Sequence, residues 1–185
     1  MRKVILDLAV TLDGFIEGPR GEIDWCIMDD EVGEYFQAFR ASIDTVLYGR
    51  TSYQEFGNHQ PDANSPQEVI DFYRDINQMK KYVFSRTLDT AAGNTTLIKD
   101  NIAEEVNKIK EQPGKDIWLF GGASLITTFV NQDLVDEYRL SVHPIVLGGG
   151  KALFQNIQHR VGLTFLKAVP YTSGVVTLYY QRANA

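Results

Sequence analysis

The order of apolar patterns along this chain constrains its fold more than any other feature of the sequence. Strand-type runs alternate with helix-type periodicity up to residue 130, and only strand-type runs follow. Alternation favours right-handed crossovers between parallel strands. Consecutive strands without helices between them are typical of antiparallel additions at one edge of a sheet. We therefore expect an α/β fold with a mostly parallel sheet.

The individual elements follow from the same patterns. Strands are expected over residues 3–10, 45–48, 81–85, 95–98, 117–120, 136–146, 163–169 and 175–182. Helical spacing of apolar residues occurs over residues 32–43, 69–79, 102–109 and 125–130. The second of these helices follows Ser65-Pro66, a suitable cap and first-turn pair. Asp7 interrupts the first apolar strand, so its carboxyl needs a buried partner or an exposed face.

Composition and charge exclude several classes of protein. The 185 residues are 44% hydrophobic and carry a formal net charge of −6, which fits one globular domain over residues 1–185. The short Lys/Arg runs predict no nucleic-acid surface, and the short apolar runs predict no membrane span and no secretory signal. The single cysteine, Cys26, excludes an intrachain disulfide, and the three histidines lack metal-ligand spacing. We expect a cytoplasmic protein without a bound metal.

Three junctions that follow strands carry glycine, hydroxyl or arginine residues. They are Gly49-Arg50-Thr51-Ser52, Ser85-Arg86-Thr87 and Gly121-Gly122-Ala123-Ser124. Ligands of open α/β sheets bind at the carboxyl ends of the parallel strands. Helix N-termini bind anions there, and arginine presents a planar fork to phosphate. Each junction alone could be a plain cap or turn, but together they predict a site for a dinucleotide with several phosphates.

The first expected strand leads into Leu12-Asp13-Gly14, and two interpretations of this segment stay open. Asp-Gly is a turn signal, so the segment could be a simple hairpin turn. It could also be a loop that covers a ligand, with Gly14 letting the backbone approach a flat ring.

The ordered set of motifs resembles a known family. The motifs are Leu12-Asp13-Gly14-Phe15-Ile16, Val46-Leu47-Tyr48-Gly49-Arg50-Thr51, Val83-Phe84-Ser85-Arg86-Thr87, Leu119-Phe120-Gly121-Gly122-Ala123-Ser124-Leu125 and His143-Pro144-Ile145-Val146-Leu147-Gly148-Gly149-Gly150. The set resembles the dihydrofolate reductase fold and, more closely, the reductase domain of the bifunctional riboflavin-biosynthesis deaminase–reductase. The resemblance implies three layers, with helices on both faces of the sheet and a C-terminal antiparallel hairpin. The zinc deaminase motifs H-x-E and P-C-x-x-C do not occur, so a stand-alone reductase domain is expected.

The resemblance implies that the cofactor is NADPH. Positions matching the family's phosphate contacts are Gly49, Arg50, Thr51, Ser85, Arg86, Thr87, Gly121, Gly122, Ala123, Ser124 and Leu125. Positions that would flank the nicotinamide are Ala9, Gly14 and Ile16, and Lys99 would lie on the adenine side. Arg86 and its neighbours would face the adenosine 2′-phosphate, a group that calls for arginine.

The substrate site is less well defined by the resemblance. Dihydrofolate reductases carry a tryptophan followed five residues later by a catalytic acid, and Trp25 and Asp30 have that spacing. Acids at a helix N-terminus are also expected for dipole reasons alone. Gly149 and Lys151 could bind a substrate phosphate or belong to a turn and bulge, and Tyr53 could stack on a substrate ring or pack in the core.

Two classes of function remain possible. The first is an NADPH-dependent reductase whose small substrate is the ribosylamino-pyrimidine intermediate of riboflavin synthesis or, as the alternative, a folate-type pterin. The second is a nucleotide-binding module without turnover. Residues 175–182 are too apolar for a bare edge strand, so we also expect a homodimer that covers this region.

Overall fold

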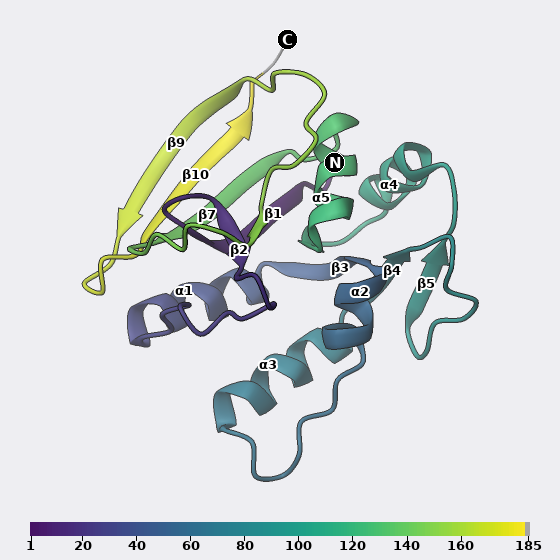
Figure 1. Cartoon of the computed structure of the whole chain (residues 1–185). Helices are drawn as coiled ribbons and strands as arrows, with labels where there is room; N and C mark the ends of the chain where they lie inside the picture. The colour runs from purple at the N-terminus through teal and green to yellow at the C-terminus, as the bar shows by residue number, and fades with distance from the viewer. Residues whose placement is uncertain (184–185) are drawn as a thin grey trace.

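The computed structural model describes residues 1–183, and its centre is an eight-stranded sheet with the order β5-β4-β3-β6-β1-β7-β10-β9 (Figure 1). The strands are β1 (Val4–Thr11), β3 (Ile43–Gly49), β4 (Lys80–Phe84), β5 (Thr95–Ile98), β6 (Asp116–Gly121), β7 (Glu137–His143), β9 (Leu163–Pro170) and β10 (Val176–Arg182). Strands β2 (Phe15–Glu17) and β8 (Lys151–Ala152) form a separate antiparallel pair. The upper boundary of the predicted domain, residue 185, lies outside the described residues.

The direction of the strands follows the predicted division of the chain. Strands β5, β4, β3, β6, β1 and β7 pair in parallel, and β10 pairs antiparallel with both β7 and β9. Helices connect β3 to β4, β5 to β6 and β6 to β7, and a loop of residues 85–94 connects β4 to β5. Parallel strands need such long connections, because the chain must return to the same end of the sheet. The mostly parallel sheet and the C-terminal antiparallel pair are therefore confirmed.

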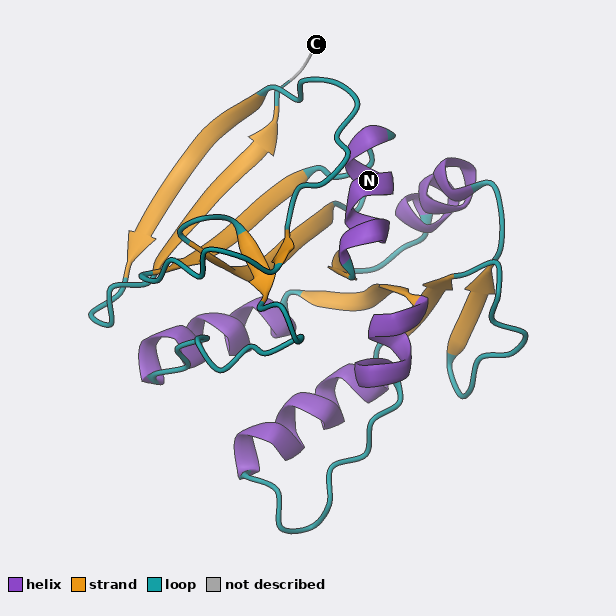
Figure 2. Ribbon diagram, viewed as in Figure 1, coloured by secondary structure: helices purple, strands orange, loops and turns teal. Residues whose placement is uncertain are grey.

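Helices cover both faces of the sheet (Figure 2). Helices α4 (Ile102–Glu111) and α5 (Ala123–Asn131) pack on one face, and α1 (Asp30–Ala41) and α3 (Gln67–Gln78) on the other. The short α2 (Arg50–Ser52) continues into the π-helical turn η1 (Tyr53–Gly57). Side chains alternate between the faces along a strand, so Leu47 packs with α5, while Val46 and Tyr48 pack toward α1 and α3. The three layers are those expected from the sequence.

Several predicted boundaries are wrong for physical reasons. The strand expected over 136–146 ends at His143, because Pro144 has no N–H to donate to a neighbouring strand. Ile43, expected at the end of a helix, begins β3 instead and is buried in the core. The sequence also predicts that a second copy of the chain covers residues 175–182, but β9 of the same chain pairs with the outer side of β10, so this strand is not an edge strand.

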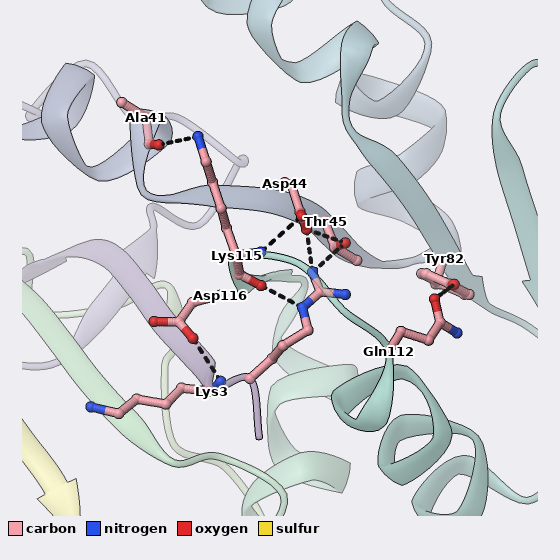
Figure 3. Close-up of polar contacts among 9 residues, drawn as sticks. Lys3, Ala41, Asp44, Thr45, Tyr82, Gln112, Lys115 and Asp116 are labelled. Atoms are coloured by element: carbon pink, nitrogen blue, oxygen red, sulfur yellow. Dashed lines mark hydrogen bonds and ion pairs between the residues drawn. The ribbon is translucent and has the colours of Figure 1, made fainter.

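Polar side chains join the amino ends of three strands at the sheet edge opposite the carboxyl ends (Figure 3). Arg2 is buried and donates hydrogen bonds to Asp44 at the start of β3, to the Thr45 hydroxyl (2.6 Å) and to the carbonyl of Lys115 before β6. The amide of Lys115 in turn donates to Asp44 Oδ2 (2.9 Å). A buried guanidinium with three acceptors fixes the relative position of β1, β3 and β6.

Replacing Arg2→Ala should destabilise the fold. The substitution removes the buried guanidinium that donates to the Asp44 carboxylate and to the Thr45 hydroxyl, which costs about 1–3 kcal/mol of unfolding free energy. Urea unfolding measures the change. Arg20→Ala is the control, because the Arg20 side chain is 90% exposed. Equal stability of the two variants would contradict this role for Arg2.

Candidate functional site

Two predicted glycine junctions meet at the carboxyl edge of the sheet. Gly49 ends β3 and is followed directly by α2, and Gly121 ends the neighbouring β6 and is followed by Gly122 and then α5. A Cβ atom at Gly49 would lie 3.5 Å from the Gly121 carbonyl oxygen, and one at Gly122 would lie 3.2 Å from Ser52 Oγ. The peptide bond between Gly121 and Gly122 is cis. The two junctions thus form one continuous surface, which larger residues would crowd.

The start of α5 has the properties of an anion site. Gly122 precedes the helix in an extended conformation and, among the described residues, no side chain caps it. The first backbone N–H groups of a helix lack intrahelical acceptors, and the helix dipole favours negative charge beside them. The end of α5 that faces Gly49 can therefore hold an anionic group.

The predicted arginines lie near this edge and are exposed. Arg50, the first residue of α2, donates to Gln54 Oε1 (3.0 Å), and Arg86 lies 3.6 Å from Asp100. Ser85 follows β4, and its amide donates to the carbonyl of Ile98 at the end of β5 (3.0 Å). The structure thus brings the third predicted junction to the same sheet edge as the first two.

The remaining residues of the third junction form a tight turn. Ser85 Oγ accepts the amide N–H groups of Thr87 (3.2 Å) and Leu88 (3.0 Å). Lys99 is exposed directly after β5. The turn presents Arg86 to solvent, with 83% of its side chain exposed.

The loop after β1 is held by the residues that follow β7. Asp13 accepts hydrogen bonds from the Thr11 hydroxyl (2.6 Å) and from the amides of Gly148 (2.8 Å) and Leu147 (3.2 Å). These donors lower the pKa of the Asp13 carboxyl, the Thr11 hydroxyl most of all. Gly14 lies in the tip of this loop with φ +86°, a conformation that favours glycine. Asp13 therefore ties the loop after β1 to the segment after β7.

A cavity of about 320 Å³ opens beside the glycine junctions. It lies between the sheet, α1, α3 and the turn formed by α2 and η1, and its wall is mainly apolar and aromatic. The residues that line it are Asp7, Leu8, Ala9, Ile16, Glu17, Ile23, Trp25, Cys26, Met28, Val32, Tyr35, Phe36, Ser52, Phe56, Phe72, Tyr73, Trp118, Phe120, Gly122, Ile126, Ser141 and His143. Such a wall suits a flat, apolar ring.

Asp7 is the buried acid of this cavity. It is 4% exposed, it lies on the central strand β1, and its Oδ2 accepts a hydrogen bond from the hydroxyl of Tyr35 on α1. Burial raises the pKa of the Asp7 carboxyl to about 7, although the Tyr35 hydrogen bond and the nearby Arg139 act in the opposite direction. Burial and the adjacent carboxylate raise the pKa of Tyr35, so this hydroxyl remains a donor.

Trp25, Cys26 and His143 form another part of the wall. The indole of Trp25 meets the His143 ring edge-on at a centroid distance of 5.3 Å. His143 Nδ1 accepts the amide N–H of Ile27 (3.1 Å), and Nε2 lies 3.8 Å from Cys26 Sγ. Burial lowers the pKa of His143 and raises the pKa of the Cys26 thiol, so both groups are held neutral.

The structure separates the residues predicted for the substrate. Trp25 lies in the cavity wall, but Asp30 is exposed at the start of α1 and does not line the cavity. Tyr53 is buried in the core, where its hydroxyl accepts from Asn58 (2.7 Å) and from a backbone amide. Lys151 Nζ lies 2.6 Å from Glu17 Oε2, and neither Lys151 nor Gly149 lines the cavity.

Sequence reasoning missed most of the cavity wall. The sequence shows Asp7 as a polar interruption of an apolar strand, but its partner Tyr35 belongs to a helix face with the spacing of core residues. Phe36, Phe72 and Trp118 have the same helical or strand spacing as core residues, and they are indeed partly in the core. A polar residue in the middle of an otherwise apolar parallel strand was the available signal.

Within residues 1–183, no three His, Cys, Asp or Glu side chains gather in a way that could hold a metal ion. No helix in the same range is long and apolar enough to cross a membrane.

Comparison with known proteins identifies relatives over the whole chain. The family model described as the RibD C-terminal domain matches residues 2–177. The uncharacterized protein YyaP of Bacillus subtilis (strain 168) is 53% identical over 179 residues, which cover 97% of this chain and 94% of YyaP. The riboflavin biosynthesis protein RibD of Corynebacterium ammoniagenes is 26% identical over 155 residues, which cover 80% of this chain and 44% of RibD.

Solved structures share the fold at lower sequence identity. A Shewanella sp. PV-4 protein, provisionally named a riboflavin biosynthesis protein, has a TM-score of 0.78 at 21% identity and full coverage of both chains. The Thermotoga maritima diaminohydroxyphosphoribosylaminopyrimidine deaminase/5-amino-6-(5-phosphoribosylamino)uracil reductase has a TM-score of 0.71 at 14% identity, covering 98% of this chain and 57% of that chain. Dihydrofolate reductase from Enterococcus faecalis, complexed with NADP(H), has a TM-score of 0.67 at 15% identity and covers 98% and 97%. The expected fold is thereby confirmed.

The raised pKa of Asp7 predicts how stability depends on pH. Between pH 3.8 and about 7 the folded chain keeps a proton that the unfolded chain has lost, so the unfolding free energy falls as the pH rises through this window. The Asp7→Asn variant has no ionisable group at this position, so its unfolding free energy does not fall in this pH window for this reason. Its stability relative to the parent should improve by on the order of 2 kcal/mol from pH 5 to pH 8.

Urea unfolding of both proteins at the two pH values measures the difference. Glu111→Gln, which removes an exposed carboxylate on α4, is the control and should show no such change. A parallel pH response of parent and Asp7→Asn would contradict the raised pKa.

Proposed function

The chain belongs to the RibD C-terminal domain family, and from that premise we propose that it is an NADPH-dependent reductase of a small, planar heterocycle. One observation carries the proposal: the predicted cofactor positions and the aromatic cavity are contiguous. Ala9, Ile16 and Gly122 belong to both. A ring bound in the cavity would therefore lie next to the predicted nicotinamide position, as hydride transfer requires.

The residues at the sheet edge fit NADPH. Gly49, Gly121 and Gly122 leave the backbone of two helix starts open to a pyrophosphate, because no side chain within the described residues caps α5. Arg50 and Arg86 are exposed at the same edge and would hold further phosphates, Arg86 the adenosine 2′-phosphate. Bound there, NADPH would supply the hydride.

The chain itself contributes orientation and the exclusion of water. Phe36, Phe56, Phe72 and Trp118 offer flat apolar surfaces that would position a ring and keep the reacting atoms dry. A proton must also reach the substrate. Solvent or Asp30 would supply it according to the sequence prediction, and Asp30 lies in contact with solvent at the start of α1.

The substrate suggested by the relatives' names is the ribosylamino-pyrimidine of riboflavin synthesis. A pterin is the alternative, and one observation favours it: the residues that line the cavity include neither Lys nor Arg, so a ribosyl phosphate would meet no cation there. Lys151, the predicted phosphate ligand, is paired with Glu17. A nucleotide-binding module without turnover is the candidate from another class.

We also propose that the chain forms a homodimer through strand β9. Among the described strands, none pairs with the outer edge of β9. Leu163, Phe165 and Leu166 of this strand are 40%, 56% and 43% exposed. A long edge strand with exposed apolar side chains is normally covered in a stable protein.

Fluorescence titration with NADPH and with NADH tests the cofactor assignment. Arg50→Ala should weaken NADPH binding by roughly tenfold, because it removes a charge-assisted contact to phosphate. Arg86→Ala should weaken NADPH binding by a similar factor and leave NADH binding nearly unchanged, because NADH lacks the 2′-phosphate. Arg160→Ala, an exposed arginine outside the predicted site, is the control.

Two results would revise the proposal. Binding of neither dinucleotide would remove the reductase assignment and leave the glycines with a structural role. Tight NADPH binding without turnover of any pyrimidine or pterin would favour the module.

Light scattering tests the dimer. The parent should have twice the mass of one chain at micromolar concentration, and Phe165→Lys should have the mass of one chain, since a buried ammonium would be left unpaired. Val69→Lys, at an exposed apolar position on α3, is the control. A monomeric parent would refute the dimer.

A further inference from the structure

The cavity wall contains two carboxyl groups, and only one of them has an ion-pair partner. Glu17 belongs to β2 and is neutralised by Lys151 at 2.6 Å. Asp7 has no such cation: the one hydrogen-bond partner of its carboxyl group among the described side chains is the neutral hydroxyl of Tyr35. A buried carboxyl group held by a single neutral donor has room for another partner.

The charges around Asp7 are already compensated. Arg139, which lies opposite Asp7 on β7, is the cation that acts on it, but its Nε donates to Glu137 Oε1 (2.7 Å), and Glu137 is also bound by Lys3 (3.1 Å). Tyr35 on α1, Tyr179 on β10 and Tyr171, which follows β9, are further titratable groups near Asp7. Asp7 therefore faces the cavity without an ion-pair partner of its own.

The hydrogen-bonding capacity of the carboxyl group is only half used. Oδ2 accepts from Tyr35, and Oδ1 has no partner within residues 1–183, yet it is not among the fully enclosed unsatisfied atoms. An unsatisfied polar atom in an apolar cavity indicates a ligand that bears nitrogen or oxygen.

The wall also limits the kind of ligand. Because no Lys or Arg lines the cavity, a phosphate or carboxylate inside it would lie beside Asp7 without a counter-charge. A neutral or protonated nitrogen ring meets the carboxyl favourably and stacks on the aromatic side chains. The chemistry of the wall thus selects a planar nitrogen heterocycle whose charged substituents, if any, remain outside.

We infer that Asp7, positioned by the Tyr35 hydroxyl, is the acid that binds and protonates a ring nitrogen of the substrate. This inference rests on the proposed reductase function for its chemical step. NADPH, where bound, would supply the hydride to the carbon of a C=N bond and would be oxidised to NADP+. As the π electron pair moved to the nitrogen, Asp7 would give that nitrogen its carboxyl proton, and Asp7 would recover a proton from solvent.

Binding of a non-reacting probe tests the inference without turnover. The probe is 2,4-diaminopyrimidine, a phosphate-free ring with protonatable nitrogen, and the signal is the fluorescence of Trp25 and Trp118 in the wall. Asp7→Asn should weaken its binding by roughly tenfold or more, because a hydrogen bond to a charged group is lost. NADPH binding, titrated separately, should change little.

Tyr35→Phe separates a positioning role from a merely structural one. The Tyr35 hydroxyl stabilises the Asp7 carboxylate, so its removal should move the pH midpoint of probe binding to higher pH. A loss of packing alone would lower affinity at all pH values without moving the midpoint. Far-UV circular dichroism and cooperative unfolding establish that each variant is folded.

The outcomes distinguish this inference from the proposed function. Unchanged probe affinity in folded Asp7→Asn would overturn the inference, and a loss of probe binding in Asp30→Asn alone would assign the role to Asp30 instead. Probe binding that depends on Asp7 in a protein that does not bind NADPH would keep the acid site and remove the reductase assignment.

Discussion

Parallel pairing between β3 and β6 is the interaction on which the rest of the structure depends. Tyr48 pairs with Gly121, so the two strands reach their carboxyl ends at the same level of the sheet. The helices that follow must then begin side by side, and Gly49 and Gly122 occupy the surface between them. At the other end of the same strands, the buried guanidinium of Arg2 holds their starting points together. The fold and the candidate cofactor site are therefore fixed by one strand pair.

The cavity depends on which strand lies in the middle of the sheet. Strand β1 pairs with β6 on one side and β7 on the other, so a polar side chain on it cannot reach solvent at a sheet edge. Asp7 consequently faces α1, where the Tyr35 hydroxyl meets it. Aromatic side chains of α1 and α3 enclose the space next to this pair. Burial, and not a neighbouring negative charge, is the main cause of the raised pKa of Asp7.

Much of the fold could be predicted because its signals are local. Period-two and period-3.6 patterns identified the main strands and helices, and the glycine junctions followed from their position after strands. Strands β2 and β8 are too short to leave a pattern, and they depend on a contact across the chain, that of Asp13 with Gly148. The pairing of Asp7 with Tyr35 joins residues 28 positions apart, and spacing cannot distinguish a cavity wall from a core. The predicted acid Asp30 had the right spacing but lies on the exposed side of its helix.

The wall of the cavity and the glycine junctions come from different parts of the architecture. Strand ends and the turns after them carry Gly49, Arg50 and Gly122, whereas the faces of α1 and α3 carry Tyr35 and Phe72. Substitutions on the two helix faces can change the shape and polarity of the cavity without disturbing the backbone of the junctions. This scaffold is therefore modular: side chains on the helix faces can be replaced while the backbone at the strand ends is kept, so a substitution that reshapes the cavity need not alter the glycine junctions.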